Sequence, residues 1–456
     1  MISRARRWAR AVVLGLVILL APWLAAPLGA LAIVRDAEIE AHVRSLADPI
    51  FEAAGLAPGA VDVYLVKDER LNAFVAGGQN LFLNTGLIAR TTTPEQLAGV
   101  IAHEAGHIAG GHLSRQMLAR EQATKQMLLG TALGLAAAAL GGPAVGTAII
   151  AGGATAAQSG VLAFTRGQEQ AADLTAIDYL AALGLPPRGL IEFLAVVETQ
   201  DLRITREGDV YRRTHPLTRD RIAALEAADA SSPYRGRTLG AERAAVHERV
   251  RAKLDGFLGD PETVLRRWNG ETFAARYARA AAHHRRGEVE DAVRLARGLV
   301  AERPKDPYLH ELLGQILFEN GRIEESIGPW REAVRLAPEA PLLRLGLARA
   351  LLERRDGRGL EEAAVLAREV VRHEPRDIGA LRVLGTAEGR LGRIGPASLA
   401  FAEAAVLARN KRDAELHLGR ARQHVGPQDP AWLRLQDLER AVAELPEPRP
   451  GDPGRR

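Results

Sequence analysis

The sequence predicts a mostly helical α+β domain followed by an all-α solenoid. The chain has 456 residues, 47% of them hydrophobic and 25% charged, which is a globular composition and too long for one average domain. Strand-like patterns occur between residues 61 and 88 with helical patterns around them, and a period near 34 residues begins at about residue 270. We therefore expect domains at residues 33–262 and 270–445, with a disordered tail at 446–456.

The N-terminus predicts export. The segment MISRARRWAR is basic, and no charge occurs from Ala11 to Val34, as in the n-region and h-region of a signal peptide. Ala30-Leu31-Ala32 forms an A-x-A cleavage pattern, so we assign residues 1–32 to a signal peptide and expect a periplasmic protein. The alternative is an uncleaved membrane anchor, because an uncharged run of this length can span a bilayer.

Composition excludes several classes of site. The chain contains no cysteine, which rules out disulfides, thiol nucleophiles and thiolate metal ligands. The formal charge is +4 and only 4% of residues are aromatic. Arginine-rich helix faces explain this charge, and nucleic acid is not expected as a partner.

The first domain is predicted to begin with a helix and a small sheet. Ala37 to Ala54 has helical character, and Val61 to Lys67 alternates as a half-buried strand does. Two apolar runs within Leu71 to Ile88 flank Gly77-Gly78, which indicates a hairpin. Thr93-Pro94-Glu95-Gln96 then provides an N-cap threonine, a proline at the first helical position and a capping-box glutamine.

The segment from Gln126 to Thr165 contains no charged residue. The glycines at 141–142 with Pro143, and the pair Gly152-Gly153, interrupt it before it forms one long span. Two interpretations remain open: a buried or membrane-facing helical hairpin, and an Ala/Gly-rich core segment or lid. Helical periodicity is expected to resume from Gly167 to Leu183.

The second half has an internal repeat. Small residues recur at intervals of 34, with one interval of 37, at Ala280, Gly314, Ala348, Gly385 and Gly419. A glycine follows seven residues later in most of these units. This is the tetratricopeptide length, in which small residues let paired helices approach closely. The last unit is expected to be degenerate.

The stretch Val100 to Arg115, VIAHEAGHIAGGHLSR, carries the chemistry. On a helix His103 and His107 share one face and can direct imidazoles at a single zinc ion. Glu104 lies beside them and can act as general base toward the attacking water, which is the H-E-x-x-H arrangement. Solvated polar residues on a helix are the alternative, but the N-cap and the apolar residues around the motif favour a buried, zincin-like helix.

A third zinc ligand must come from elsewhere in the chain. His112, five residues after His107, lies roughly 140° around the helix from it and so faces elsewhere, which favours a structural role for His112. The pair Glu169 and Asp173, four residues apart in TRGQEQAAD, is the best remaining candidate. One can ligate zinc while the other orients a ligand histidine.

These motifs together resemble a known family. NAFVAGGQNLFLNTGLI, HEAGH, R-x-x-E-x-x-A-D from Arg166 to Asp173, and THPLTRDRI from Thr214 to Ile222 occur in this order. The sequence is similar to the zinc metallopeptidases related to the heat-shock protease HtpX and the CAAX prenyl protease, and to exported members that carry tetratricopeptide repeats.

The resemblance implies site roles. It makes His103, His107 and Glu169 zinc ligands, Glu104 the base and Asp173 the partner that orients a ligand. His215 and Arg221 are given transition-state contacts or control of access to the metal. It also suggests that the strand around Gln79 to Leu83 pairs with an extended substrate.

The implied activity is that of a zinc endopeptidase in quality control of outer-membrane or envelope proteins. Implied partners are unfolded or misassembled envelope proteins, the outer-membrane assembly machinery and a peripheral membrane contact, with the repeats recruiting clients. The alternative is a chaperone or adaptor that acts through its repeats, with proteolysis in a minor or regulated role.

Overall fold

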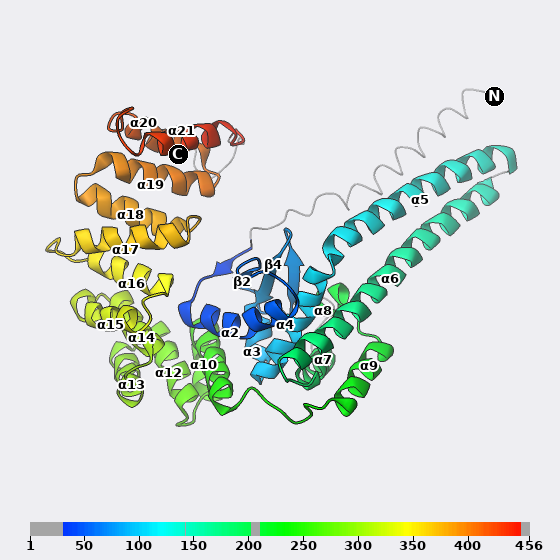
Figure 1. Ribbon diagram of the computed structural model, residues 1–456, viewed down its shortest axis with the longest axis horizontal. Helices are drawn as coiled ribbons and strands as arrows, with labels where there is room; N and C mark the ends of the chain where they lie inside the picture. The colour runs from blue at the N-terminus through cyan, green and yellow to red at the C-terminus, as the bar shows by residue number, and fades with distance from the viewer. Residues whose placement is uncertain (1–30, 142, 202–209, 448–456) are drawn as a thin grey trace.

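The computed structural model describes residues 31–141, 143–201 and 210–447. The predicted signal peptide and C-terminal tail fall almost wholly outside these residues. Within them a mixed α/β body adjoins an array of paired helices, and a long helical hairpin projects from the body (Figure 1). The α+β fold followed by an all-α repeat array is thus confirmed.

A four-stranded sheet forms one layer of the body. Its strands are β1 (Ile33–Val34), β2 (Asp62–Val66), β3 (Ala73–Ala76) and β4 (Asn80–Asn84), in the order β1-β2-β4-β3. β4 runs parallel to β2 and antiparallel to β3, with Leu81 opposite Val63 and Val75. The predicted hairpin around Gly77-Gly78 is therefore the β3–β4 pair.

One expectation about this sheet is wrong. The strand around Gln79 to Leu83 was predicted to pair with substrate, yet β4 is central and has a partner strand on both sides. The edge strands of the sheet are β1 and β3, so β3 is the hairpin strand that lies at an edge. Alternating apolar residues mark both strands of a hairpin equally, so sequence alone does not show which one a third strand will cover.

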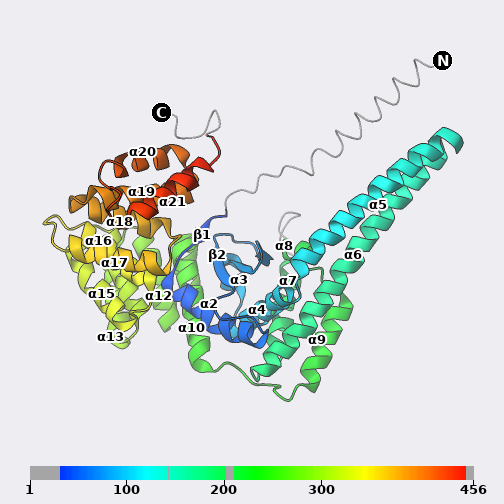
Figure 2. The ribbon, with the colours of Figure 1, turned by 45° about the horizontal axis from the view of Figure 1, so that its top comes forward.

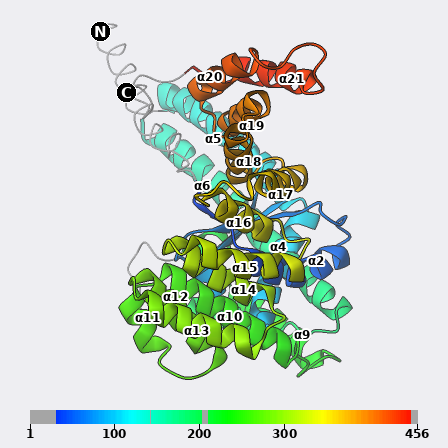
Figure 3. The same ribbon diagram turned by 90° about the vertical axis from the view of Figure 1, so that its left-hand side faces the viewer.

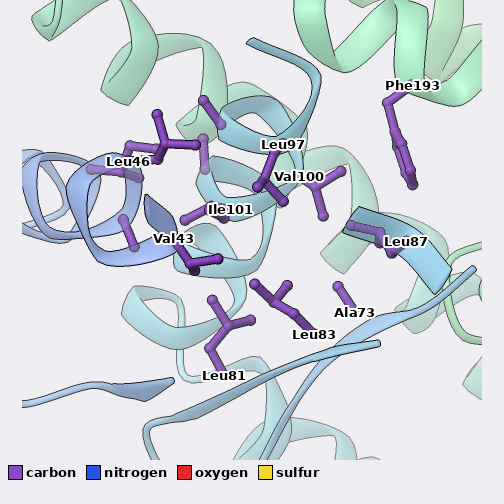
Figure 4. Packing of buried hydrophobic residues seen from close by; sticks show 14 of the residues in the cluster. Val43, Leu46, Ala73, Leu81, Leu83, Leu87, Leu97, Val100, Ile101 and Phe193 are labelled. Carbon is purple, nitrogen blue, oxygen red and sulfur yellow. The ribbon is translucent and has the colours of Figure 1, made fainter. Parts of the chain in front are cut away.

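The helices of the body cover the inner face of this sheet. They are α2 (Ala37–Ala53), α3 (Thr85–Arg90), α4 (Pro94–Ala109) and α7 (Arg188–Asp201). Leu81 and Leu83 of the sheet and Val100 and Ile101 of α4 have no exposed surface, and they meet in one core with residues of α2 and α7 (Figure 4). Burial of this many aliphatic side chains fixes α4 in the centre of the body.

The start of α4 follows from local sequence. The Thr93 hydroxyl accepts a hydrogen bond from the Gln96 backbone N–H, and Pro94 occupies the first turn. The Gln96 side-chain oxygen accepts from the Thr92 N–H at 2.7 Å rather than from Thr93. The capping residues were thus predicted correctly, with the reciprocal bond displaced by one residue.

Two long helices, α5 (His112–Gly141) and α6 (Pro143–Ala182), form the projecting hairpin (Figures 1 and 2). Helix α6 is continuous through Gly152 and Gly153 and does not begin anew at Gly167. Large apolar side chains along the hairpin are exposed. The segment is therefore a hairpin outside the core, and the interpretation as a core segment is wrong.

Shorter helices complete the body and lead to the array. They are α8 (Val210–Thr214), α9 (Arg219–Ser231), α10 (Ala241–Leu258) and α11 (Pro261–Arg267). Helix α10 contacts α3 and α2 on one side and α12 of the array on the other. The two parts of the chain therefore meet along a shared helix.

The array consists of five helix pairs stacked in sequence order (Figure 3). They are α12 (Phe273–Arg285) with α13 (Val289–Glu302), α14 (Pro307–Glu319) with α15 (Ile323–Leu336), α16 (Pro341–Leu352) with α17 (Leu360–His373), α18 (Ile378–Arg390) with α19 (Ile394–Leu407), and α20 (Lys411–Ala421) with α21 (Trp432–Ala443). A Cβ at Gly314 would lie 3.0 Å from the Trp330 ring, so this repeat position admits only a very small residue.

A buried ionic cluster joins the body to the array. Glu38 of α2 contacts Arg249 and Lys253 of α10 and accepts a hydrogen bond from the Tyr277 hydroxyl of α12 at 3.2 Å. Lys253 also lies 3.0 Å from Glu311 of α14. Because all these groups are nearly inaccessible to solvent, each charge depends on its partners for stabilisation.

We expect Glu38→Gln to lower the free energy of unfolding by about 3 kcal/mol, because it leaves two buried cations short of a carboxylate. Urea denaturation of the full chain measures this. The matched control is Glu290→Gln, which removes an exposed partner of Arg322 and should change stability by less than about 0.5 kcal/mol. Equal effects of the two substitutions would contradict a structural role for the cluster.

Candidate metal centre

Helix α4 places the three motif residues at the centre of the body. His103 and Glu104 are buried, and His107 lies one turn further on with partial exposure. The Nε2 atoms of the two histidines are 3.1 Å apart. The two imidazoles therefore converge on one point, as the spacing predicts.

Helix α6 brings two carboxylates to the same point. A Cβ at Gly106 would lie 2.5 Å from the Thr175 hydroxyl and 3.0 Å from the Ala172 Cα, so the absence of a side chain there permits α6 to approach α4. Glu169 consequently lies 3.5 Å from His103 Nε2 and 3.3 Å from His107 Nε2.

Asp173 contacts the other side of the His103 ring. Its Oδ1 is 2.9 Å from His103 Nδ1. A carboxylate in this position accepts a hydrogen bond from Nδ1–H, which leaves Nε2 free to bind a cation. The sequence-based pairing of Glu169 toward the cluster and Asp173 behind a histidine agrees with this geometry.

The segment after α8 adds a third imidazole. His215 Nδ1 lies 3.3 Å from His103 Nε2 and 3.2 Å from Glu169 Oε2. Its Nε2 lies 3.3 Å from the carbonyl oxygen of Ala73, the first residue of edge strand β3. His215 thus connects the cluster to the edge of the sheet.

Arg221, in the first turn of α9, binds both carboxylates. Its Nε and Nη2 donate to the two oxygens of Asp173 at 2.6 and 2.9 Å, and its Nη1 lies 2.9 Å from Glu169. Nη1 also donates to the Pro216 carbonyl at 2.8 Å. Arg221 therefore fixes Asp173 and the backbone next to His215.

The donor atoms have the spacing of a tetrahedral site. Two ligand atoms at zinc's usual distances of 2.0–2.1 Å are separated by roughly 3.3 Å when the geometry is tetrahedral. One donor atom from each of His103, His107, Glu169 and His215 lies within 4.8 Å of the others. Five contacts among these residues span 3.1 to 3.5 Å, with His107 facing Glu169 Oε1 and the other two histidines facing Oε2. Three imidazoles and a carboxylate are also a donor set that suits zinc.

Charges in the cluster stabilise one another. Burial lowers the pKa of His103, but the carboxylates of Asp173 and Glu169 outweigh it and raise this pKa to about 10. Burial alone would raise the pKa of Glu169, yet hydrogen bonds from the histidines hold it far below its usual range. Such strongly anionic surroundings favour a cation among the imidazoles, with release of the His103 proton on binding.

Glu104 is placed differently from the other carboxylates. Its Oε1 is buried and has no hydrogen-bond partner among the described residues. His215 Nε2 lies 3.4 Å from it, beyond a good hydrogen bond. A buried carboxylate oxygen without a donor is costly unless it receives one, such as a water molecule.

One sequence argument about His112 is wrong. Helix α4 ends at Ala109, and Gly111 has a φ of 59°, so His112 starts the new helix α5. Its Nδ1 lies 2.9 Å from His107 Nδ1, opposite the Nε2 that faces the cluster. The Gly110-Gly111 pair signals this break, which lets His112 support His107 instead of facing away.

Tyr211 was not identified from the sequence. Its ring packs against His215 with centroids 4.7 Å apart, and its hydroxyl is buried without a hydrogen-bond partner among the described residues. Burial, reinforced by the nearby Glu104 carboxylate, raises its pKa well above the usual value. Its position four residues before His215 on a helix is the only signal in the sequence.

Comparisons with known proteins agree with this site. Residues 34–229 match the profile of Peptidase family M48. The chain is 26% identical over 335 residues to the "Beta-barrel assembly-enhancing protease" of Yersinia pestis, covering 71% of this chain and 67% of that protein. It is 26% identical over 392 residues to the protein of the same name from Escherichia coli K12, covering 83% and 78%.

Another relative matches a shorter part of the chain at higher sequence identity. The "Metalloprotease LoiP" of Escherichia coli K12 is 35% identical over 136 residues, which cover 28% of this chain and 47% of that protein. The metallopeptidase family expected from the four motifs is therefore confirmed. Residues 34–229 form a metallopeptidase domain of family M48.

Proposed function

We propose that the protein is a periplasmic zinc-dependent endopeptidase that removes misassembled envelope proteins, with the repeat array recruiting them. The observation that carries the proposal is the tetrahedrally spaced donor set beside the unpartnered Glu104 oxygen. The names of the relatives, which refer to β-barrel assembly, support envelope clients. The predicted signal peptide supports export.

His103, His107 and Glu169 hold the zinc ion in this proposal. Asp173 fixes the tautomer of His103 through the 2.9 Å contact to Nδ1, and Arg221 fixes both carboxylates. When bound, zinc polarises the scissile carbonyl and lowers the pKa of water. Arg221 is then a positioning residue, because its donors contact Asp173, Glu169 and the Pro216 carbonyl.

Glu104 moves the protons. Its free oxygen takes a proton from the attacking water as the C–O bond forms, and it passes that proton to the amine nitrogen as the peptide C–N bond breaks. The low accessibility of the site strengthens these interactions. The Tyr211 hydroxyl, which has no hydrogen-bond partner among the described residues, is available to donate to the developing oxyanion.

His215 closes the site in this state. It completes the four donors, so it occupies the position that an attacking water needs. Its contact with the Ala73 carbonyl places it also at the edge of β3, where an extended peptide would add a strand. Withdrawal of this one side chain would therefore free both the fourth coordination position and the first backbone acceptor of the edge strand.

Glu104→Gln should lower kcat/KM for peptide hydrolysis by about 10³-fold and leave zinc bound, because the base is lost and no ligand is. Activity on casein and zinc content by atomic absorption measure both properties. Loss of zinc in this variant would contradict the role. Full rescue of envelope defects by Glu104→Gln in a strain lacking the protein would favour the adaptor function.

Glu169→Gln should weaken zinc binding by more than about 100-fold, because a neutral amide replaces a ligating carboxylate. Competition with a chromophoric chelator gives the affinity. The control is Glu198→Gln on α7, an exposed glutamate, which should bind zinc as the wild type does. Unchanged affinity in Glu169→Gln would move the third ligand elsewhere.

His215→Ala should raise basal proteolysis and self-cleavage about tenfold or more, because the fourth position opens. Cobalt-substituted protein should at the same time lose the spectrum of a site with three imidazoles. If His215 instead stabilises the oxyanion, activity falls about 10²-fold with the spectrum unchanged. Wild-type turnover with an unchanged spectrum would exclude both roles.

A further inference from the structure

The hairpin of α5 and α6 exposes large apolar side chains along its length. Leu128 is 65% exposed, Leu133 59% and Leu135 53%. Figure 2 shows that the outer part of the hairpin stands clear of the body and of the array. Helix α6 is the one described helix long and apolar enough to cross a membrane, and only 6% of its most apolar window is buried.

The apolar surface surrounds the hairpin instead of forming a stripe. Leu133 and Leu135 are two residues apart, roughly 200° around the helix, and both are exposed. A helix that docks in a protein groove needs one apolar face and keeps a polar one toward water. A single protein groove would cover only one of these two sides. A lipid bilayer surrounds a helix and covers both, so the exposed leucines favour lipid.

Contacts within the hairpin are of the kind that membrane helices use. A Cβ at Gly134 would lie 2.7 Å from the Gly146 carbonyl, and one at Gly130 would lie 3.3 Å from the Gly153 Cα. Close approach of backbones through small residues stabilises helix pairs where no hydrophobic effect acts between them.

Two threonine hydroxyls in the segment are satisfied inside their own helices. The Thr131 hydroxyl donates to the Met127 carbonyl at 2.8 Å, and the Thr155 hydroxyl donates to the Ala151 carbonyl at 2.8 Å. Such bonds lower the cost of placing a hydroxyl in hydrocarbon.

Charge marks where the segment ends. No charged residue occurs from Gln126 to Thr165, and Arg115, Arg120 and Lys125 precede Gln126 on α5, where Lys125 pairs with Glu121. Basic residues at this boundary bind anionic headgroups. The uncharged part of α5, ending at Gly141, is roughly 24 Å long, shorter than the hydrocarbon core of about 30 Å.

We propose that residues 126–141 and 143–157 insert into a lipid bilayer as a re-entrant hairpin, with Gln126 and Ala157 at the same membrane surface. The basic residues at its base lie among the headgroups. This binding does not depend on the proposed function.

A consequence follows for the metal centre, and it rests on the proposed function. Glu169 follows Ala157 by twelve residues on the same helix, roughly 18 Å along its axis, and His112 begins the other helix beside His107. Insertion therefore holds the centre within roughly 20 Å of the membrane surface. The substrates are then polypeptide segments that emerge from the bilayer.

The absence of cysteine allows a local test in the full chain. Leu133→Cys and Leu135→Cys, on opposite sides of α5, and the control Leu433→Cys, 70% exposed on α21, are each labelled with a nitrobenzoxadiazole dye. Vesicles of phosphatidylethanolamine and phosphatidylglycerol carry a nitroxide deep in the acyl chains. Each variant is also made with Glu104→Gln, so that proteolysis does not affect the readout.

Both hairpin labels should shift to the blue and be quenched by the nitroxide, with no change at residue 433. Quenching at only one of the two positions would mean a helix lying on the surface and would overturn insertion, as would quenching at neither. A blue shift without vesicles that grows with protein concentration would assign the surface to a second copy. Insertion of the labelled variants, with no peptidase activity in the otherwise wild-type chain, would refute the proposed function alone.

Discussion

The contact between α4 and α6 is the constraint on which the rest of the site depends. His103 joins the two helices, since one ring nitrogen meets Asp173 and the other faces Glu169 and His107. Arg221 binds both carboxylates from α9 and so fixes the segment that carries His215. One buried network therefore sets the tautomer of His103, the position of Glu169 and the approach of His215. A substitution in any of these residues disturbs the others.

The same helices link the centre to the outer parts of the molecule. Helix α6 carries Glu169 and Asp173 at its body end and exposed apolar residues further out. On the other side, α2 and α10 share the Glu38, Arg249 and Lys253 cluster with the array. The elements that join the array and the hairpin to the body thus pack directly around α4.

Much of this arrangement was predictable from sequence because local rules determine it. The i, i+4 spacing of His103 and His107, the Thr93 cap and the 34-residue period each reflect a helix's own geometry. The pairing of Glu169 and Asp173 with separate tasks also follows from helical spacing.

The sequence-based predictions were wrong where packing between residues distant in the sequence determines the structure. Whether β3 or β4 is the edge depends on β2, which is distant in sequence and pairs with β4 in parallel. The direction of His112 depends on a helix break at Gly110-Gly111. The role of Tyr211 depends on burial against His215, and no residue pattern encodes that burial.

The location of the metal tests the account most directly. Anomalous scattering at the zinc edge from crystals of the full chain should give one peak, about 2.0–2.2 Å from His103 Nε2, His107 Nε2 and a Glu169 oxygen. His215 should approach the same peak in the resting protein. A peak at the other group of possible ligands, His283, Glu288 and Asp291, with none between α4 and α6, would contradict the account.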